Sequence, residues 1–136
     1  VLTISGKIGL TNAGDKAVFD MAMLEAMPKT VIDTTTPWTS GKTHFEGVSL
    51  SYLLELTKAS GSTLIAGALN DYSVNLPVAD ARQYSPVIAY KLNGAYMPVR
   101  EKGPLWIMYP FDSSSDLKTE TIYSRAVWQL QSLVVS

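Results

Sequence analysis

The stretch that decides the fold lies in the second half of the chain and reads Asn93-Gly94, then Arg100-Glu101-Lys102-Gly103-Pro104-Leu105-Trp106-Ile107-Met108-Tyr109-Pro110, and then Val127-Trp128-Gln129-Leu130. Asn93-Gly94 stands between two apolar runs and predicts a β-hairpin, because a type I′ turn needs positive φ at both central residues. The apolar runs of this half predict strands at 87–92, 96–100, 105–109 and 126–135. The polar segment 112–118 between the last two runs is expected to form a surface loop.

The first half of the chain predicts two short helices. Asp20 is a good N-cap and Leu24 is spaced to pack on Phe19, so a helix should run as far as Met27 and stop at Pro28. From Ser49 onward, apolar residues repeat at helical spacing and predict a second helix, with Gly61 as the residue that follows its end.

Short apolar segments, separated by turn residues, come before and after these helices in the sequence. Alternating or β-branched patterns predict strands at 1–8, 30–36, 64–69 and in a segment that ends near Pro77. Residues 37–47 contain Pro and Gly and are expected to be a loop, and residues 80–84 a single helical turn. About eight strands with two or three short helices indicate an α+β, strand-rich mixed fold.

Composition limits the classes of protein that this chain can belong to. Its 136 residues, 46% of them hydrophobic, suit one domain over residues 1–136 with a core of its own. The net charge of −1 comes from interspersed charges, so we expect no nucleic-acid partner. No apolar run approaches the roughly 20 residues that cross a bilayer, so no direct membrane insertion is expected.

The chemically reactive residues are few. His44 is the only histidine and there is no cysteine, so neither a four-ligand zinc site nor a disulfide framework is indicated. The sequence contains no Gly-x-Ser-x-Gly elbow, no Gly-x-Gly-x-x-Gly turn and no Walker motif, which argues against hydrolytic triads and nucleotide cradles.

The remaining polar and aromatic residues suit a flat heterocycle that stacks and forms hydrogen bonds through its edge. The aromatic candidates are Trp38, Tyr72, Trp106 and Tyr109. The candidates for binding the edge are Asn70, Asp71, Arg100 and Glu101, and His44 is expected to close the rim. Each has an alternative interpretation: core packing for the rings, turn chemistry for Asp71 and Tyr72, and a solvated ion pair for Arg100 and Glu101.

Two further segments, together with 100–110, carry a resemblance to a known family. They read Thr34-Thr35-Thr36-Pro37-Trp38 and Gly47-Val48-Ser49-Leu50-Ser51-Tyr52-Leu53-Leu54. In this order they resemble the sulfite oxidase-type molybdopterin-binding domain, over nearly the whole chain. The enzymes of that family have a metal-binding cysteine near the position of Thr34 or Thr35, and usually an arginine at the position of Trp106. Because a threonine hydroxyl is not a soft thiolate, the resemblance implies a pterin site without molybdenum.

With these two departures, the chain resembles a subgroup of small bacterial proteins that have the fold without the cysteine. That resemblance implies non-catalytic binding of a reduced, tetrahydropterin-like ligand, in a mature periplasmic protein whose signal peptide has been removed. It further implies that the loaded form regulates the periplasmic domain of an inner-membrane diguanylate cyclase or phosphodiesterase, with loop 37–46 as the element that responds to the ligand. Two alternatives remain: a molybdopterin-dependent oxidoreductase or a subunit of one, without the cysteine ligand, and a degenerate domain kept only for protein contacts.

Overall fold

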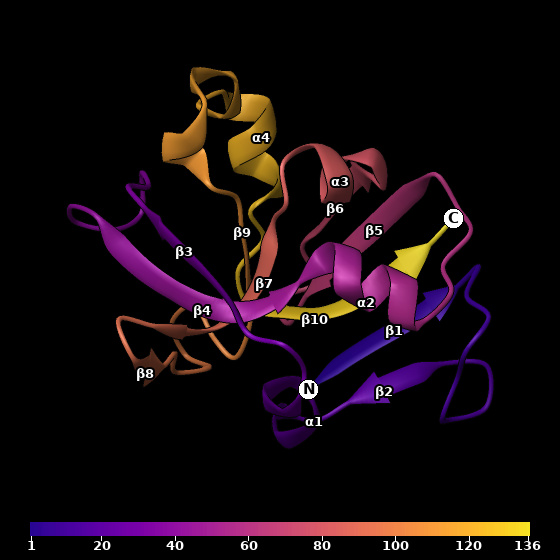
Figure 1. The fold of residues 1–136 in the computed structure, drawn as a ribbon. Helices are drawn as coiled ribbons and strands as arrows, with labels where there is room; N and C mark the ends of the chain where they lie inside the picture. The colour runs from indigo at the N-terminus through magenta and orange to yellow at the C-terminus, as the bar shows by residue number, and fades with distance from the viewer.

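The computed structural model describes residues 1–136 as a mixed α+β, strand-rich structure (Figure 1). Its elements are β1 (Leu2–Gly6), β2 (Ala17–Phe19), α1 (Met21–Ala26), β3 (Thr30–Thr34), β4 (Thr43–Ser49), α2 (Leu50–Leu56), β5 (Thr63–Ala68), β6 (Ser73–Pro77), α3 (Ala79–Gln83), β7 (Val87–Leu92), β8 (Ala95–Tyr96), β9 (Trp106–Met108), the 3-10 helices η1 (Phe111–Ser113) and η2 (Ser115–Leu117), α4 (Glu120–Arg125) and β10 (Leu130–Val135).

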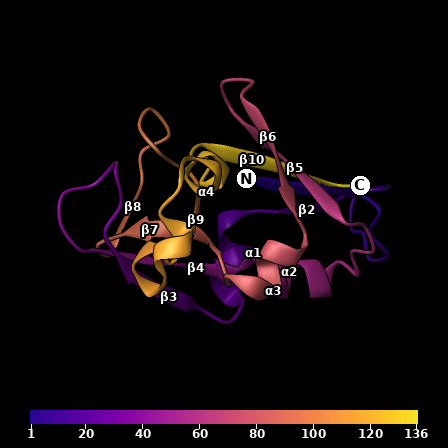
Figure 2. The same cartoon turned by 90° about the horizontal axis from the view of Figure 1, so that it is seen from above.

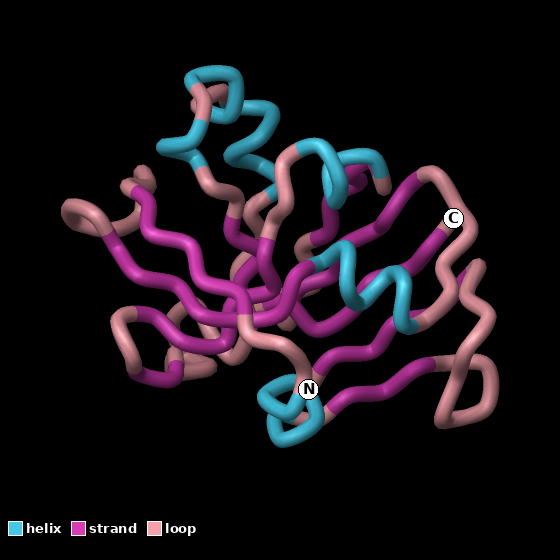
Figure 3. The backbone as a smooth tube through the Cα atoms, in the orientation of Figure 1, coloured by secondary structure: helices cyan, strands magenta, loops and turns pink.

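The strands form two five-stranded sheets. One has the order β2-β1-β10-β5-β6, and the other has β3-β4-β7-β8 with β9 also paired to β7. The first sheet joins the two ends of the chain, because β1 pairs in parallel with β10. Figure 2 shows the β5–β6 hairpin rising away from the helices α2 and α3, and Figure 3 shows that strands make up more of the chain than the short helices do. An isolated bridge between Trp106 and Trp128 connects β9 with the segment before β10.

The predicted helix starts and the predicted hairpin are confirmed. The Asp20 side chain accepts a hydrogen bond from the backbone N–H of Met23, and Ser49 caps α2 in the same way through the N–H of Tyr52. Asn93 and Gly94 have φ of 49° and 84°, as a type I′ turn requires. These elements were predictable because local side-chain chemistry determines them.

The prediction of a loop over residues 37–47 is wrong for its second half, because Thr43–Ser49 form strand β4. Gly47 lies in this strand where the register shifts, and a Cβ there would collide with the carbonyl of Ile88 on β7. The glycine therefore permits close strand packing rather than a turn. Strand β2 was also not predicted, since three residues are too few to show an alternating pattern of apolar and polar side chains.

Two other local predictions need correction. The residue in the left-handed conformation after α2 is Lys58, with φ of 54°, rather than Gly61. The second hairpin strand is only Ala95–Tyr96 instead of reaching residue 100. The predicted surface loop at 112–118 contains η1 and η2. Helix α4 follows it and was not predicted.

One hydrophobic cluster contains buried side chains from both sheets, from Leu2 and Leu133 in the first to Phe45 and Ile88 in the second. Trp106, from β9, is completely buried in this cluster. The core therefore extends directly beneath the segment 126–128, where the candidate site lies. None of the helices combines the length and the apolar character that spanning a membrane requires.

Candidate functional site

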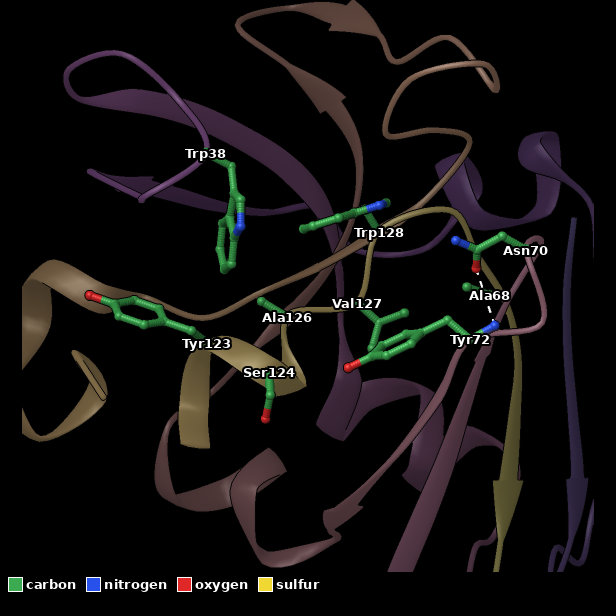
Figure 4. A pocket seen from close by; sticks show the side chains of 9 residues that line it. All are labelled: Trp38, Ala68, Asn70, Tyr72, Tyr123, Ser124, Ala126, Val127 and Trp128. Atoms are coloured by element: carbon green, nitrogen blue, oxygen red, sulfur yellow. Dashed lines mark hydrogen bonds between the residues drawn. The ribbon is translucent and has the colours of Figure 1, made fainter. Parts of the chain in front are cut away.

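A largely apolar pocket of about 380 Å³ lies between α4, the β5–β6 turn and the loop that follows β3 (Figure 4). Its lining consists of Trp38, Ala68, Asn70, Tyr72, Tyr123, Ser124, Ala126, Val127 and Trp128. This volume falls within the range of roughly 300–1,000 Å³ that is usual for small-molecule sites. The lining comes from three separate parts of the chain, so only the folded protein forms it.

Trp38 is the centre of a cluster of aromatic rings at one side of the pocket. Its ring centroid lies 5.7 Å from that of Trp106, 5.7 Å from that of Trp128 and 5.8 Å from that of Tyr123, in edge-to-face arrangements. Phe111 is 6.1 Å away and tilted. Edge-to-face pairs are favourable because the positive edge of one ring meets the negative face of the other. The loop that carries Trp38 is therefore fixed to the core by its tryptophan.

Trp128 forms a second aromatic wall, and a cation covers one of its faces. The Nζ of Lys102 lies 4.0 Å from the Trp128 ring centroid. Lys102 is not among the lining residues, and a ring that stacks on Trp128 has to use the face that the ammonium leaves free. In Figure 4 the Trp128 ring is seen edge-on, with Tyr72 and Val127 beneath it in the view.

Polar groups at the pocket are few and partly unpaired. The Asn70 Oδ1 accepts a hydrogen bond of 3.2 Å from the backbone N–H of Tyr72, which leaves the Asn70 amide donors without a protein partner. The backbone N–H groups of Val127 and Trp128 donate to no protein acceptor. Such groups suit the edge of a ligand, since unpaired backbone donors are uncommon away from water or ligands.

A buried polar network holds α4 in place beneath the pocket. Asp80 on α3 is 3% exposed, and its Oδ2 accepts hydrogen bonds from Arg125 Nη1 at 2.7 Å and from the Tyr109 hydroxyl at 2.9 Å. Burial, and then the neighbouring Asp80 carboxylate, raise the pKa of Tyr109 well above its ordinary value, so the phenol remains a donor. Arg125 ends α4, whose Tyr123 and Ser124 line the pocket.

Three of the predicted site residues, Trp38, Asn70 and Tyr72, are brought together in this pocket. Trp106 lies directly behind it: its ring is fully buried, and its Nε1 donates to the Ala126 carbonyl at 3.1 Å. Tyr109 is also fully buried, in the Asp80 network. For these last two residues the structure favours the packing interpretation, because neither side chain reaches the cavity.

The other four predicted residues lie outside the lining. Asp71 is an exposed turn residue with φ of 66°. Arg100 and Glu101 are exposed in the turn before β9, where Glu101 borders a separate groove. His44 lies on β4, where its Nδ1 is 2.8 Å from Asp33 and its Nε2 is 3.3 Å from Glu46. His44 therefore belongs to a charged surface cluster and does not close the rim of this pocket.

The sequence analysis missed Tyr123, Ser124 and Trp128 as pocket residues. The first two belong to the unpredicted helix α4, although a signal was present: Thr119 accepts a hydrogen bond from the N–H of Ile122 as an N-cap, with acidic Glu120 in the first turn. Trp128 was expected to be a core residue of a strand. Its segment stops short of β10, and Gln129 takes φ of 52°, so its ring is turned to the cavity.

The family whose sequence profile matches this chain is the oxidoreductase molybdopterin-binding domain, over residues 13–112. The chain belongs to this family. In structure it is similar to the sulfane dehydrogenase SoxCD from Paracoccus pantotrophus, with a TM-score of 0.71 and 16% sequence identity over 98% of this chain. The match spans 37% of the SoxCD chain, and an identity this low supports the fold alone. No curated protein sequence matches this chain.

The residues present do not fit the molybdenum-bearing cofactor that this family name implies. By the resemblance, the family's metal-binding cysteine falls near Thr34 or Thr35. Thr34 is fully buried; its hydroxyl donates to the Thr35 carbonyl and accepts from the N–H of Asp112, both at 3.0 Å. The Thr35 hydroxyl and N–H donate to the Asp112 carboxylate at 2.6 Å and 2.9 Å, which lowers the pKa of Asp112 to about 2. Both hydroxyls are engaged, and neither is a soft ligand.

The pocket also lacks the charged groups that the full cofactor would need. No lysine or arginine is in the lining, so a phosphate there would find no cation. Two cations next to lining residues are already engaged, Arg125 by Asp80 and Lys102 by the Trp128 ring. No group of three or more His, Cys, Asp or Glu side chains is arranged to hold a metal ion. The pocket is chemically suited to a neutral, flat ring.

Proposed function

We propose that this molybdopterin-binding-domain protein binds a metal-free pterin and does not catalyse a redox reaction. The observation that carries the proposal is the aromatic pocket at residues 38, 72, 123 and 128, which lies in a domain of a pterin-cofactor family but contains neither thiolate nor free cation. A neutral pterin ring without metal or phosphate needs stacking surfaces and hydrogen-bonding groups for its edge, and the pocket supplies both.

The edge of the ligand would meet groups that lack partners in the protein. A pterin edge alternates donors and acceptors, and the pocket offers the Asn70 amide N–H groups and the backbone N–H groups of Val127 and Trp128. The exposed Tyr72 ring, at 50% exposure, is available to cover the bound ring from the solvent side. Trp38 would make contact from the opposite part of the pocket, where the aromatic cluster holds it.

We further propose that the ligand is a reduced, tetrahydropterin-like molecule and that the protein works in the periplasm. The loaded protein would regulate an inner-membrane diguanylate cyclase or phosphodiesterase through the periplasmic domain of that enzyme. The support for these points is the sequence resemblance to small cysteine-free bacterial regulators. The loop of Trp38 is the candidate responsive element, because a ligand can shift an equilibrium only if it contacts an element that differs between the two states.

The deciding experiment is the chemical analysis of protein purified from a bacterial periplasm. Small molecules released by denaturation would be identified by mass spectrometry and fluorescence, and the same sample would be analysed for molybdenum. We expect one pterin per protein chain and no molybdenum. A phosphorylated pyranopterin with molybdenum would contradict the proposal and support the oxidoreductase alternative. An empty pocket that also fails to bind added tetrahydropterin would support a domain kept only for protein contacts.

A further inference from the structure

Lys102 is half-buried and holds its ammonium over one face of the Trp128 ring, which also lines the pocket. Two hydrogen bonds fix the turn that carries it: the Gln129 N–H donates to the Lys102 carbonyl at 2.9 Å, and the Gln129 Nε2 donates to the Val99 carbonyl at 2.8 Å. Since Gln129 directly follows Trp128, the cation and the indole are attached to each other through the backbone as well as through the ring.

We propose that Lys102 is a specificity-determining residue that acts through Trp128 and selects for electron-rich heterocycles. This inference rests on the proposed function, because it assumes that the ligand ring stacks on the pocket face of Trp128. A cation over one face of an indole draws electron density toward itself through the ring quadrupole. The opposite face then becomes a better surface for a ring with excess electron density than for an electron-poor ring.

The electrostatic reach of Lys102 is sufficient for this effect. A ring stacked at a distance of about 3.5–4 Å from Trp128 would lie roughly 8 Å from Nζ, with only the indole between them. Because the indole occupies the space between the cation and the stacked ring, their interaction is weakened less than it would be between two groups separated by water. Among rings of the same outline, reduced pterins carry electron-donating ring nitrogens, whereas oxidised pterins contain an electron-poor pyrazine.

The protein contains a matched control for this arrangement. The Nζ of Lys91 lies 4.9 Å from the ring centroid of Tyr96, in a second lysine–aromatic pair that takes no part in the pocket. Removing the charge of Lys91 therefore tests the general effect of losing a cation–π contact and one positive charge. Only Lys102 is expected to affect ligand choice.

The test compares wild type with Lys102→Met, Lys102→Arg and Lys91→Met, using 6-methyltetrahydropterin without oxygen and oxidised 6-methylpterin as probes. Kd for each probe would be measured by calorimetry, with thermal unfolding to show that each variant is folded. We expect Lys102→Met to raise Kd for the tetrahydropterin about tenfold and to leave Kd for the oxidised pterin within about twofold. Lys102→Arg retains the charge and should restore the preference, and Lys91→Met should behave as wild type.

The outcomes separate this inference from the proposed function. If wild type binds neither probe, the proposed function fails and the inference fails with it. If wild type binds pterin and Lys102→Met weakens both probes equally, Lys102 has only a packing role and the inference is overturned while the proposed function stands. If Lys102→Met does not fold, Lys102→Gln is measured by the same criterion.

Discussion

Two regions that share helix α4 treat their polar groups in opposite ways. Below the helix, Arg125 and Tyr109 both donate hydrogen bonds to Asp80, and the three side chains are largely removed from solvent. At the pocket, Asn70 and the backbone of Val127 and Trp128 keep donors that no protein group uses. The first region has no unpaired hydrogen-bonding group to offer a ligand, and the second has several.

The comparison distinguishes the side chains that maintain the fold of this small domain from those that are accessible to a ligand. Tyr109 and Tyr72 are both tyrosines of the predicted site, but Tyr109 is fully buried and Tyr72 is 50% exposed. No buried side-chain nitrogen or oxygen in the protein lacks a hydrogen-bond partner. A ligand is therefore expected to bind where side chains remain exposed. The buried network of Asp80, Arg125 and Tyr109 holds helix α4 in position at the edge of the pocket.

The largest effect is expected from Asp80→Ala. This change leaves the Arg125 guanidinium and the Tyr109 hydroxyl without their acceptor in a buried setting, and breaking such a pair should cost about 3–5 kcal/mol of unfolding free energy. Urea unfolding measures the loss, with Asp15→Ala at an exposed position in a turn as the control. A loss below about 1 kcal/mol would show that the network does not hold α4 and would remove the contrast between the two regions.

Trp38→Leu should affect both stability and binding. The indole makes four ring contacts, so its loss should lower the unfolding free energy by about 2–3 kcal/mol and weaken tetrahydropterin binding by more than about tenfold. Calorimetric titration and urea unfolding on the same samples give the two values. Trp38→Phe keeps an aromatic ring and should lose less of both; if it equals Trp38→Leu, the ring contacts are not what matters.

Tyr72→Ala should separate binding from stability. Because the side chain is half exposed, the unfolding free energy should change by no more than about 0.5 kcal/mol. The tetrahydropterin Kd should rise about tenfold, as expected when a stacked ring loses an aromatic partner. Tyr96→Ala is the control, since Tyr96 is 55% exposed and outside the pocket. Equal Kd values for the two variants would argue against a ligand on Tyr72.

His44→Gln is expected to have the smallest effect, confined to pH-dependent stability. The hydrogen bond with Asp33, aided by the charge of Asp33 and by Glu46, raises the pKa of His44 above its ordinary value of 6.5. Protonated His44 therefore stabilises the folded state fully below pH 6.5, and this contribution is lost as pH rises through the higher folded-state pKa.

The Tm difference between wild type and His44→Gln should accordingly be larger at pH 5.5 than at pH 8.5. Thermal unfolding at the two pH values measures it. The tetrahydropterin affinity should not change, since His44 does not line the pocket. A loss of affinity in this variant would restore the predicted rim position of His44 and enlarge the site beyond its aromatic walls.

Local chemistry made much of the fold predictable. Asp20 and Ser49 cap the first two helices, and Asn93-Gly94 forms the hairpin, because each of these signals acts within a few residues. Strand β4 and helix α4 were not predicted. In the sequence, Gly47 looks like a loop residue, and only the folded structure shows that it makes room for the carbonyl of Ile88. The N-cap at Thr119 stands among polar residues that are typical of a loop.

The candidate site was predictable only in part. Trp38, Asn70 and Tyr72, which were selected by their residue type and their positions in turns, lie together in the lining of one pocket. The same reasoning selected Trp106, Tyr109 and His44, which the structure places in the core or in a surface ion cluster. Residue type shows which groups are able to stack or bind, but only packing decides which of them remain accessible.

The sequence by itself determined the absence of a thiolate, the positions of the caps and the hairpin, and the aromatic residues available for a ring-binding site. The tertiary structure decided which rings face the cavity, that Arg125 is neutralised by Asp80, and that Lys102 covers one face of Trp128. The physical reason is the distance along the chain between the residues that interact. Caps and turns depend on neighbours along the chain, whereas the exposure and pairing of a side chain depend on residues that folding brings from 20 to 90 positions away.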